Sequence, residues 1–428
     1  MATLQQEKEK ERIRSVAHLL HQAAKPIRIL QAIGWSQQVK VDFFAKNAQE
    51  LPEVTYPGFD PQPTLELLYE ARNQIFPMSR VDQWLERQSN CIEWGARMLA
   101  NVGTPGFFNY SCQAYGQPKA PLRYDPITPL ELAEKIREDI ENLNHINMNV
   151  PSPAIHSCDE VAPQIEQAVK AHFGEDAPQV NIVDELSANA LATSKQIRLR
   201  KDAKFTDKDA IQLINHEAFI HVLTSLNGKK QTDLPILGDG HVGTTRTQEG
   251  LAVFAEVISG SMELSRLQRL ADRVFAIQMA IEGADFLEVY RYFLERTGEP
   301  DQAFESSRRV FRGGVITGGA PFTKDVVYLF GLLQVSSVIR AVFSAGRADC
   351  LELLFCGKLD CVDVPALGEL VVMGLCKMPR YLPPWIVDPR SLLAFLSYST
   401  FMSQMNLDSL TEIVKRFLAD TPIIDPKL

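Results

Sequence analysis

The segment NHEAFIH at residues 215–221 holds two of the eight histidines of the chain around a glutamate, in the pattern HExxxH. The surrounding sequence predicts a long helix. This helix should begin at Thr206, whose hydroxyl can cap the first turn, and end near Gly228, because glycine is favoured just beyond a helix end. Both His216 and His221 would then belong to one helix.

The spacing of these two histidines constrains the helix. Five residues advance a regular α-helix by about 500°, which leaves the two imidazoles roughly 140° apart and unable to share a metal ion easily. Local π geometry, with about 4.4 residues per turn, reduces that separation to roughly 50°. We therefore predict a π-bulge or a comparable distortion between His216 and His221. In a regular α-helix they would instead be two separate structural histidines.

A third candidate ligand stands in the sequence QEGLA at residues 248–252. We expect a turn over residues 243–247 and then a helix over residues 248–259, with Glu249 in its first turn. A carboxylate would complete a site of two histidines and one acid, which leaves a catalytic zinc ion one position for water. The alternative is a first-turn acid that complements the helix dipole. Gly250 favours the metal site, because glycine inside a helix costs about 1 kcal/mol and a close approach would explain it.

Composition excludes several classes of protein. The chain has 428 residues, of which 45% are hydrophobic and 23% charged, so we expect a folded globular protein. Its net charge of -9 has the wrong sign for a general nucleic-acid or anionic-membrane binder. The seven cysteines form no CxxC pair, which argues against a disulfide framework or a cysteine zinc site. Motifs for nucleotide binding and the GxSxG motif of serine hydrolases are absent from the sequence.

Two segments bear on localisation. The N-terminal sequence MATLQQEKEKERIR is charged and helix-prone, without the apolar region of a secretory signal, so we expect a cytoplasmic protein. Residues 326–346 form the most apolar long stretch, but they include Gln334 and Arg340 within a helical pattern. We predict a buried helix there and no membrane partner.

The hydrophobic pattern predicts an α+β protein that is mostly helical, in two regions. Residues 1–125 should form a helical N-terminal region, with helical spacing of the apolar residues over residues 7–33, a second helical region over residues 64–99 and a loop over residues 102–121. Residues 126–428 should form the catalytic domain. Within it we expect helices over residues 129–142 and 159–173, strands over residues 179–184 and 195–200, metal-binding helices up to residue 260, and a helical lobe over residues 261–428.

The sequence segments around the candidate metal site, taken together, resemble those of a known family. HEAFIH, the following Leu226-Asn227-Gly228 and TTRTQEGLA resemble the QEGLA-motif family of bacterial proteins, a zincin-like group related to the microtubule-associated tyrosine carboxypeptidases. The resemblance runs from about Glu53 to Phe395. It implies a zincin-like metallopeptidase fold, with a small sheet beside the HExxxH helix. It also implies Zn²⁺ as cofactor, a catalytic Glu217, and three zinc ligands: His216, His221 and Glu249.

A carboxypeptidase also needs a cation for the terminal carboxylate of its substrate. Arg309 and Arg312 lie three residues apart near glycines, and Lys324 opens a later helix, so these three are the candidate substrate-binding residues. We favour Arg312 and Lys324 for the carboxylate. Solvent-exposed charges without a role in binding are the alternative.

Three further residues are candidates for supporting roles. Tyr328 or His241 would stabilise the oxyanion of the transition state, or would be a packed tyrosine and a histidine that only lines the cleft. Glu256 lies on the same helical face as Glu249 and would be a hydrogen-bond partner of a zinc-binding histidine, or simply a structural acid.

These observations lead to a zinc-dependent metallopeptidase, a carboxypeptidase that removes one residue from the C-terminal tail of a peptide or protein. Two histidines and a carboxylate also suit a non-haem iron oxygenase, although the adjacent Glu217 then has no role. A regulatory or binding protein with a retained metal site is the other alternative. The sequence leaves the physiological substrate and the oligomeric state open.

Overall fold

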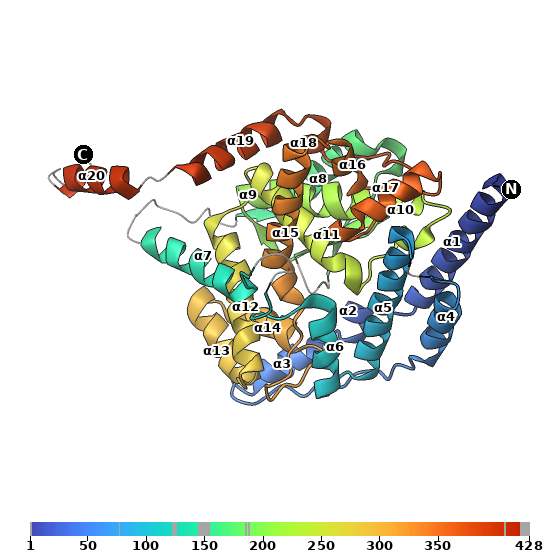
Figure 1. Cartoon of the computed structure of the whole chain (residues 1–428). Coiled ribbons are helices and arrows are strands. Elements are labelled where there is room, and N and C mark those ends of the chain that lie inside the picture. Colours follow the sequence, from blue (N-terminus) through green and yellow to red (C-terminus); the bar gives the residue numbers. More distant parts are fainter. Residues whose placement is uncertain are drawn as a thin grey trace. The chain divides into compact units, whose positions relative to one another are not determined.

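Helices dominate the chain and two small sheets accompany them, in agreement with the α+β class expected from the sequence (Figure 1). The computed structural model describes residues 2–76, 78–121, 126–143, 155–184, 186, 189–405 and 408–419. The chain divides into two compact units, Met1–Pro383 and Pro384–Leu428. The candidate site lies in the first unit. The functional division expected near residue 126 stays a prediction.

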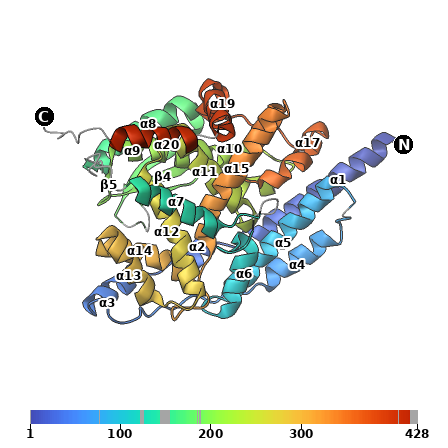
Figure 2. The same ribbon diagram turned by 60° about the vertical axis from the view of Figure 1, so that its left-hand side comes forward.

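The N-terminal part of the first unit is helical, as expected, and consists of several helices. They are α1 (Ala2–Ala24), α2 (Ile29–Ala32), α3 (Gln37–Ala45), α4 (Gln62–Arg72), α5 (Arg80–Ala100) and α6 (Pro105–Tyr115). The region with helical spacing over residues 7–33 is helical, but it is divided between α1 and α2. Helix α1 ends at Ala24, shortly before Pro26, whose ring removes a backbone donor. The helical region expected over residues 64–99 is likewise divided between α4 and α5. Helices α1, α4 and α5 lie side by side (Figure 2).

The loop expected over residues 102–121 was also wrong. It contains α6, which has Pro105 at its first position and ends at Gly116, where φ is 87°. Proline suits the first turn of a helix and glycine suits the left-handed conformation that ends one. The same residues that indicated a loop therefore mark the two ends of a short helix.

The sheets lie near the helix that carries the HExxxH sequence. The elements are α7 (Pro129–Leu143), β1 (His156–Ser157), α8 (Cys158–Phe173), η1 (Gly174–Asp176), β2 (Gln179–Val183), β3 (Ala190–Ala192), β4 (Gln196–Arg200) and β5 (Lys204–Phe205). Strands β2 and β4 are parallel, with Val180 opposite Ile197, and β3 pairs antiparallel with β4. Strand β3, which the sequence did not predict, contacts the π-helix η2 (Ile214–Val222).

The remaining helices of the first unit include two central ones, α11 (Val242–Ile258) and α15 (Val327–Ser344). The others are α9 (Asp207–Leu213), α10 (Leu223–Lys229), η3 (Pro235–Gly238), α12 (Leu264–Ile281), α13 (Phe286–Thr297), α14 (Pro300–Phe311), η4 (Lys324–Val326), α16 (Asp349–Leu353), η5 (Cys361–Asp363) and α17 (Val364–Val372). The second unit contains α18 (Pro384–Val387), α19 (Arg390–Gln404) and α20 (Asp408–Ala419).

Helices α11 and α15 cross in the middle of the first unit (Figures 1 and 2). Their backbones meet at two glycines. A Cβ atom on Gly250 would lie 2.3 Å from the carbonyl oxygen of Gly331, and one on Gly331 would lie 2.2 Å from that of Arg246. The close approach expected at Gly250 is therefore the backbone of α15. By length and composition the segment Lys324–Ser344 could also cross a membrane, and half of its most apolar 18-residue window is buried inside the protein.

Candidate metal centre

The π-helix η2 brings the two histidines of the HExxxH sequence onto one face. It interrupts the long helix between α9 and α10, and the N–H of Leu223 donates to the carbonyl of Ala218, five residues earlier. The imidazole centroids of His216 and His221 lie 5.0 Å apart. The predicted π distortion is thus confirmed. It spans nine residues and is not a single bulge.

Helix α11 adds the third candidate ligand. The Oε2 atom of Glu249 lies 3.8 Å from Nε2 of His216 and 3.8 Å from Nε2 of His221. One ligand atom from each of the three residues falls within 4.8 Å of the others. This donor set of two imidazoles and one carboxylate fits a zinc ion with an open position. Glu217 is half-buried and directly follows His216 in the chain.

Glu256 supports the first histidine, one of the roles expected for it. Its carboxylate is fully buried and lies 2.7 Å from Nδ1 of His216. Arg266 donates two hydrogen bonds to the same carboxylate, each of 3.0 Å, and Gln212 donates a third of 2.9 Å. Burial alone would raise the pKa of Glu256, but Arg266 and His216 hold it well below its usual range. The carboxylate is therefore ionised and accepts, so Nδ1 of His216 carries the proton and Nε2 is free to bind a metal.

The second oxygen of Glu249 is held by Lys324. The Nζ atom of Lys324 donates to Oε1 of Glu249 at 2.8 Å. Burial disfavours the charged form of Glu249 and of Lys324. The Lys324 ammonium and the two imidazoles nevertheless keep the pKa of Glu249 well below its usual range. The charge of Glu249 in turn raises the pKa of Lys324 above its usual value. Lys324 thus contacts a candidate metal ligand, and its expected contact with substrate stays a prediction.

The two candidate arginines differ in their partners. Arg309 donates to both oxygens of Asp325, at 2.6 and 2.9 Å, and to the hydroxyl of Tyr328 at 3.4 Å. Arg312 is only 8% exposed, and among the described residues its Nε has no hydrogen-bond partner. Burial and the neighbouring Arg309 lower the pKa of Arg312 to about 10. Arg312 therefore combines burial with an unused donor.

His241 lies at the start of α11, well away from Glu249. Eight residues of helix separate the two, about 12 Å along the axis. The N-cap of α11 is His241, whose Nδ1 accepts from the N–H of Gly243 at 3.2 Å. The turn expected over residues 243–247 was therefore wrong, and Glu249 does not lie in the first turn. The buried Thr247 explains the difference, because its hydroxyl accepts from the N–H of Cys361 at 2.9 Å and tertiary contacts stabilise the helix.

Sequence reasoning missed two residues beside the candidate centre. Lys358 donates to the carbonyl of His221 at 3.4 Å and to Oε1 of Gln248 at 3.2 Å, and burial lowers its pKa to about 8. Tyr115 of α6 is buried, which raises the pKa of its hydroxyl, and the charges of Lys324, Arg312 and Glu249 act on it. Neither residue stands near a motif. No signal in the sequence marked them.

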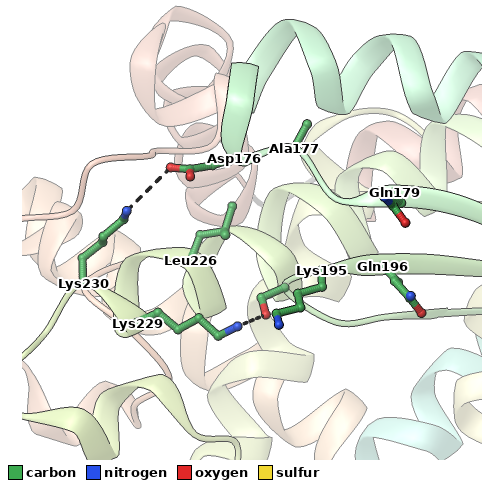
Figure 3. Close-up of a pocket in the computed structure, with 9 residues that line it drawn as sticks. Asp176, Ala177, Gln179, Lys195, Gln196, Leu226, Lys229 and Lys230 are labelled. Carbon is green, nitrogen blue, oxygen red and sulfur yellow. Dashed lines mark hydrogen bonds and ion pairs between the residues drawn. The ribbon is translucent and has the colours of Figure 1, made fainter.

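A large open cleft lies at the end of α10 (Figure 3). It has a volume of about 510 Å³, and the described residues that line it do not include the three candidate ligands. Lys230 pairs with Asp176 at 3.9 Å (Figure 3). Lys229 donates a hydrogen bond to Ser194, which also lines the cleft. The cleft is thus separate from the candidate metal centre.

Comparison with known families places the chain in a family of carboxypeptidases. The chain belongs to the family described as microtubule-associated tyrosine carboxypeptidase, whose model matches residues 41–404. The matched range contains every candidate site residue, so the family resemblance expected from the sequence is confirmed. No curated protein matches the chain.

Proposed function

We propose that this protein is a zinc-dependent carboxypeptidase that removes one residue from the C-terminal tail of a peptide or protein. The observation that carries the proposal is the convergence of His216, His221 and Glu249 beside Glu217, in a chain of a carboxypeptidase family. The sheet edge formed by β3 against η2 supports a zincin-like arrangement. The name of the family suggests tyrosine as one terminal residue to test.

The chemistry follows from the groups on the two helices. Zinc, when bound, would act as a Lewis acid on the scissile carbonyl and on a water molecule. Glu217 would accept a proton from the attacking water as the new C–O bond forms, and would deliver it to the leaving amine as the C–N bond breaks. The products are the shortened peptide and one free amino acid.

Arg312 is the candidate for the terminal carboxylate of the substrate. Its guanidinium is buried with an unused Nε donor, whereas Arg309 is bonded to Asp325. A buried guanidinium binds a carboxylate strongly because its donors match the two oxygens. Tyr328, which accepts a hydrogen bond from Arg309, is the candidate for the oxyanion.

A peptide library tests the proposal. The zinc-loaded protein is incubated with peptides varied at their last three positions, including tyrosine-ended tails, and the products are read by mass spectrometry. We expect loss of one C-terminal residue, and we expect a chelator to stop it. Glu217→Gln should abolish hydrolysis and keep the zinc content of the parent protein. Absence of cleavage of every peptide would contradict the proposal and favour a binding or regulatory role.

A further inference from the structure

The contact between Lys324 and Glu249 suggests a role for Lys324 other than binding substrate. The two oxygens of Glu249 have different surroundings. Oε2 faces the Nε2 atoms of both histidines at 3.8 Å, whereas Oε1 accepts a hydrogen bond from Lys324 at 2.8 Å. We infer that Lys324 is a positioning residue, which holds Glu249 so that a single oxygen is presented to the metal.

The backbone around Lys324 is held on both sides. The N–H of Thr323 donates to the hydroxyl of Ser111 at 2.9 Å, and the two hydroxyls are 2.8 Å apart. On the other side, Asp325 is bonded to Arg309 and lies 3.6 Å from Arg273. Lys324 therefore extends from a short segment, η4, and the residues on either side of it, Thr323 and Asp325, are held by hydrogen bonds. A side chain on a fixed backbone can orient its partner precisely.

Burial strengthens this contact. Lys324 is only 7% exposed, and its ammonium also lies 5.2 Å from the ring centre of Tyr328. A buried ammonium at 2.8 Å from a carboxylate is already compensated, and a substrate carboxylate would have to compete with Glu249 for it. Among the described residues, Nε of Arg312 has no hydrogen-bond partner. The two cations thus have different roles: Lys324 orients Glu249, and Arg312 binds the carboxylate of the substrate.

Glu256 acts on His216 in a comparable way, so two of the three candidate ligands have a charged partner behind them. Such partners typically change metal affinity by about 10- to 100-fold when they are removed, because the ligand loses its orientation. The inference rests on the proposed metal site. Its test therefore measures metal binding in the absence of any peptide.

The experiment compares Lys324→Met with Arg312→Gln. Zinc affinity is measured by competition with a chromophoric chelator, and cobalt is substituted to read the ligand geometry from its visible spectrum. We expect Lys324→Met to lower zinc affinity by about 10- to 100-fold and to alter the cobalt spectrum. Arg312→Gln, which removes a cation of similar burial that is not bonded to Glu249, should leave both unchanged.

A conservative variant separates positioning from general stability. Lys324→Arg keeps a buried donor for Glu249 and should recover most of the zinc affinity. Lys324→Gln, which also removes the charge, replaces Lys324→Met if that variant does not fold. Thermal unfolding of the metal-free proteins reports on the fold. Parental zinc affinity in Lys324→Met, together with a raised KM, would overturn the inference and make Lys324 a substrate residue. If the parent protein binds zinc but cleaves no peptide, the proposed function fails and the inference is still tested.

Discussion

Nδ1 of His216 donates a hydrogen bond of 2.7 Å to the buried carboxylate of Glu256. This contact fixes the tautomer of a candidate zinc ligand, since an ionised carboxylate can only accept. The carboxylate is in turn held by Arg266. The imidazole, the acid and the arginine therefore form one chain of contacts behind the candidate metal centre.

Removal of the charge at Glu256 should weaken metal binding. In Glu256→Gln the neutral amide can no longer act as a charged acceptor for Nδ1 of His216. We expect zinc affinity to fall by about 10- to 100-fold, measured by chelator competition on the folded protein. Glu282→Gln is the control, because Glu282 is exposed and bonded to Lys119 on the surface. Equal affinities in the two variants would rule out this role.

The crossing of α11 and α15 should be intolerant of a single methyl group. Gly250→Ala would place Cβ 2.3 Å from the carbonyl oxygen of Gly331, so the helices must move apart. We expect the free energy of unfolding to fall by about 1–3 kcal/mol or more in urea titrations. In the control Gly368→Ala, also within a helix, the nearest atom is 3.8 Å away, and we expect a gain of up to about 1 kcal/mol. A stable Gly250→Ala protein would show that the crossing can widen.

His241 should make stability depend on pH. Burial, together with the charge of Arg87, lowers the pKa of His241 from 6.5 to about 4 in the folded protein. Between these values the unfolded chain binds the proton and the folded protein does not, so stability falls as the pH falls from 6.5 toward 4. His241→Asn keeps a good N-cap and removes the titration. The difference in free energy of unfolding between parent and variant should be constant above pH 6.5. Below pH 6.5 the parent should lose stability relative to the variant.

Arg312 should distinguish free from amidated C-termini. If its guanidinium binds the terminal carboxylate, Arg312→Gln should lower kcat/KM for free-acid peptides by about 10- to 100-fold, the effect of a hydrogen bond to a charged group. Peptides with an amidated C-terminus should be affected far less. Arg291→Gln, on the exposed side of α13, is the control. The same loss with both kinds of peptide would assign Arg312 a structural role.

The candidate metal-binding residues could be located in the sequence because their signal is local. His216 and His221 are five residues apart, and that spacing converges only if the helix widens, so the sequence required the π geometry that η2 shows. Thr206 and Asp209 form the capping box at the start of this helix for equally local reasons. Element boundaries were less accurate at Pro26, where the helical region over residues 7–33 is divided, and at the threonine-rich start of α11, where a turn was expected.

The sequence by itself thus determined the identity of the candidate ligands, the helix that carries two of them, and the mostly helical class. Only the tertiary structure decided which charges act on the site. Lys324 is 75 residues from Glu249, and Lys358 is 110 residues from Gln248, so their pairing depends on how α11 packs against later segments. The physical reason is that spacing along a helix sets which side chains share a face, whereas contacts between distant segments arise from packing of the whole core.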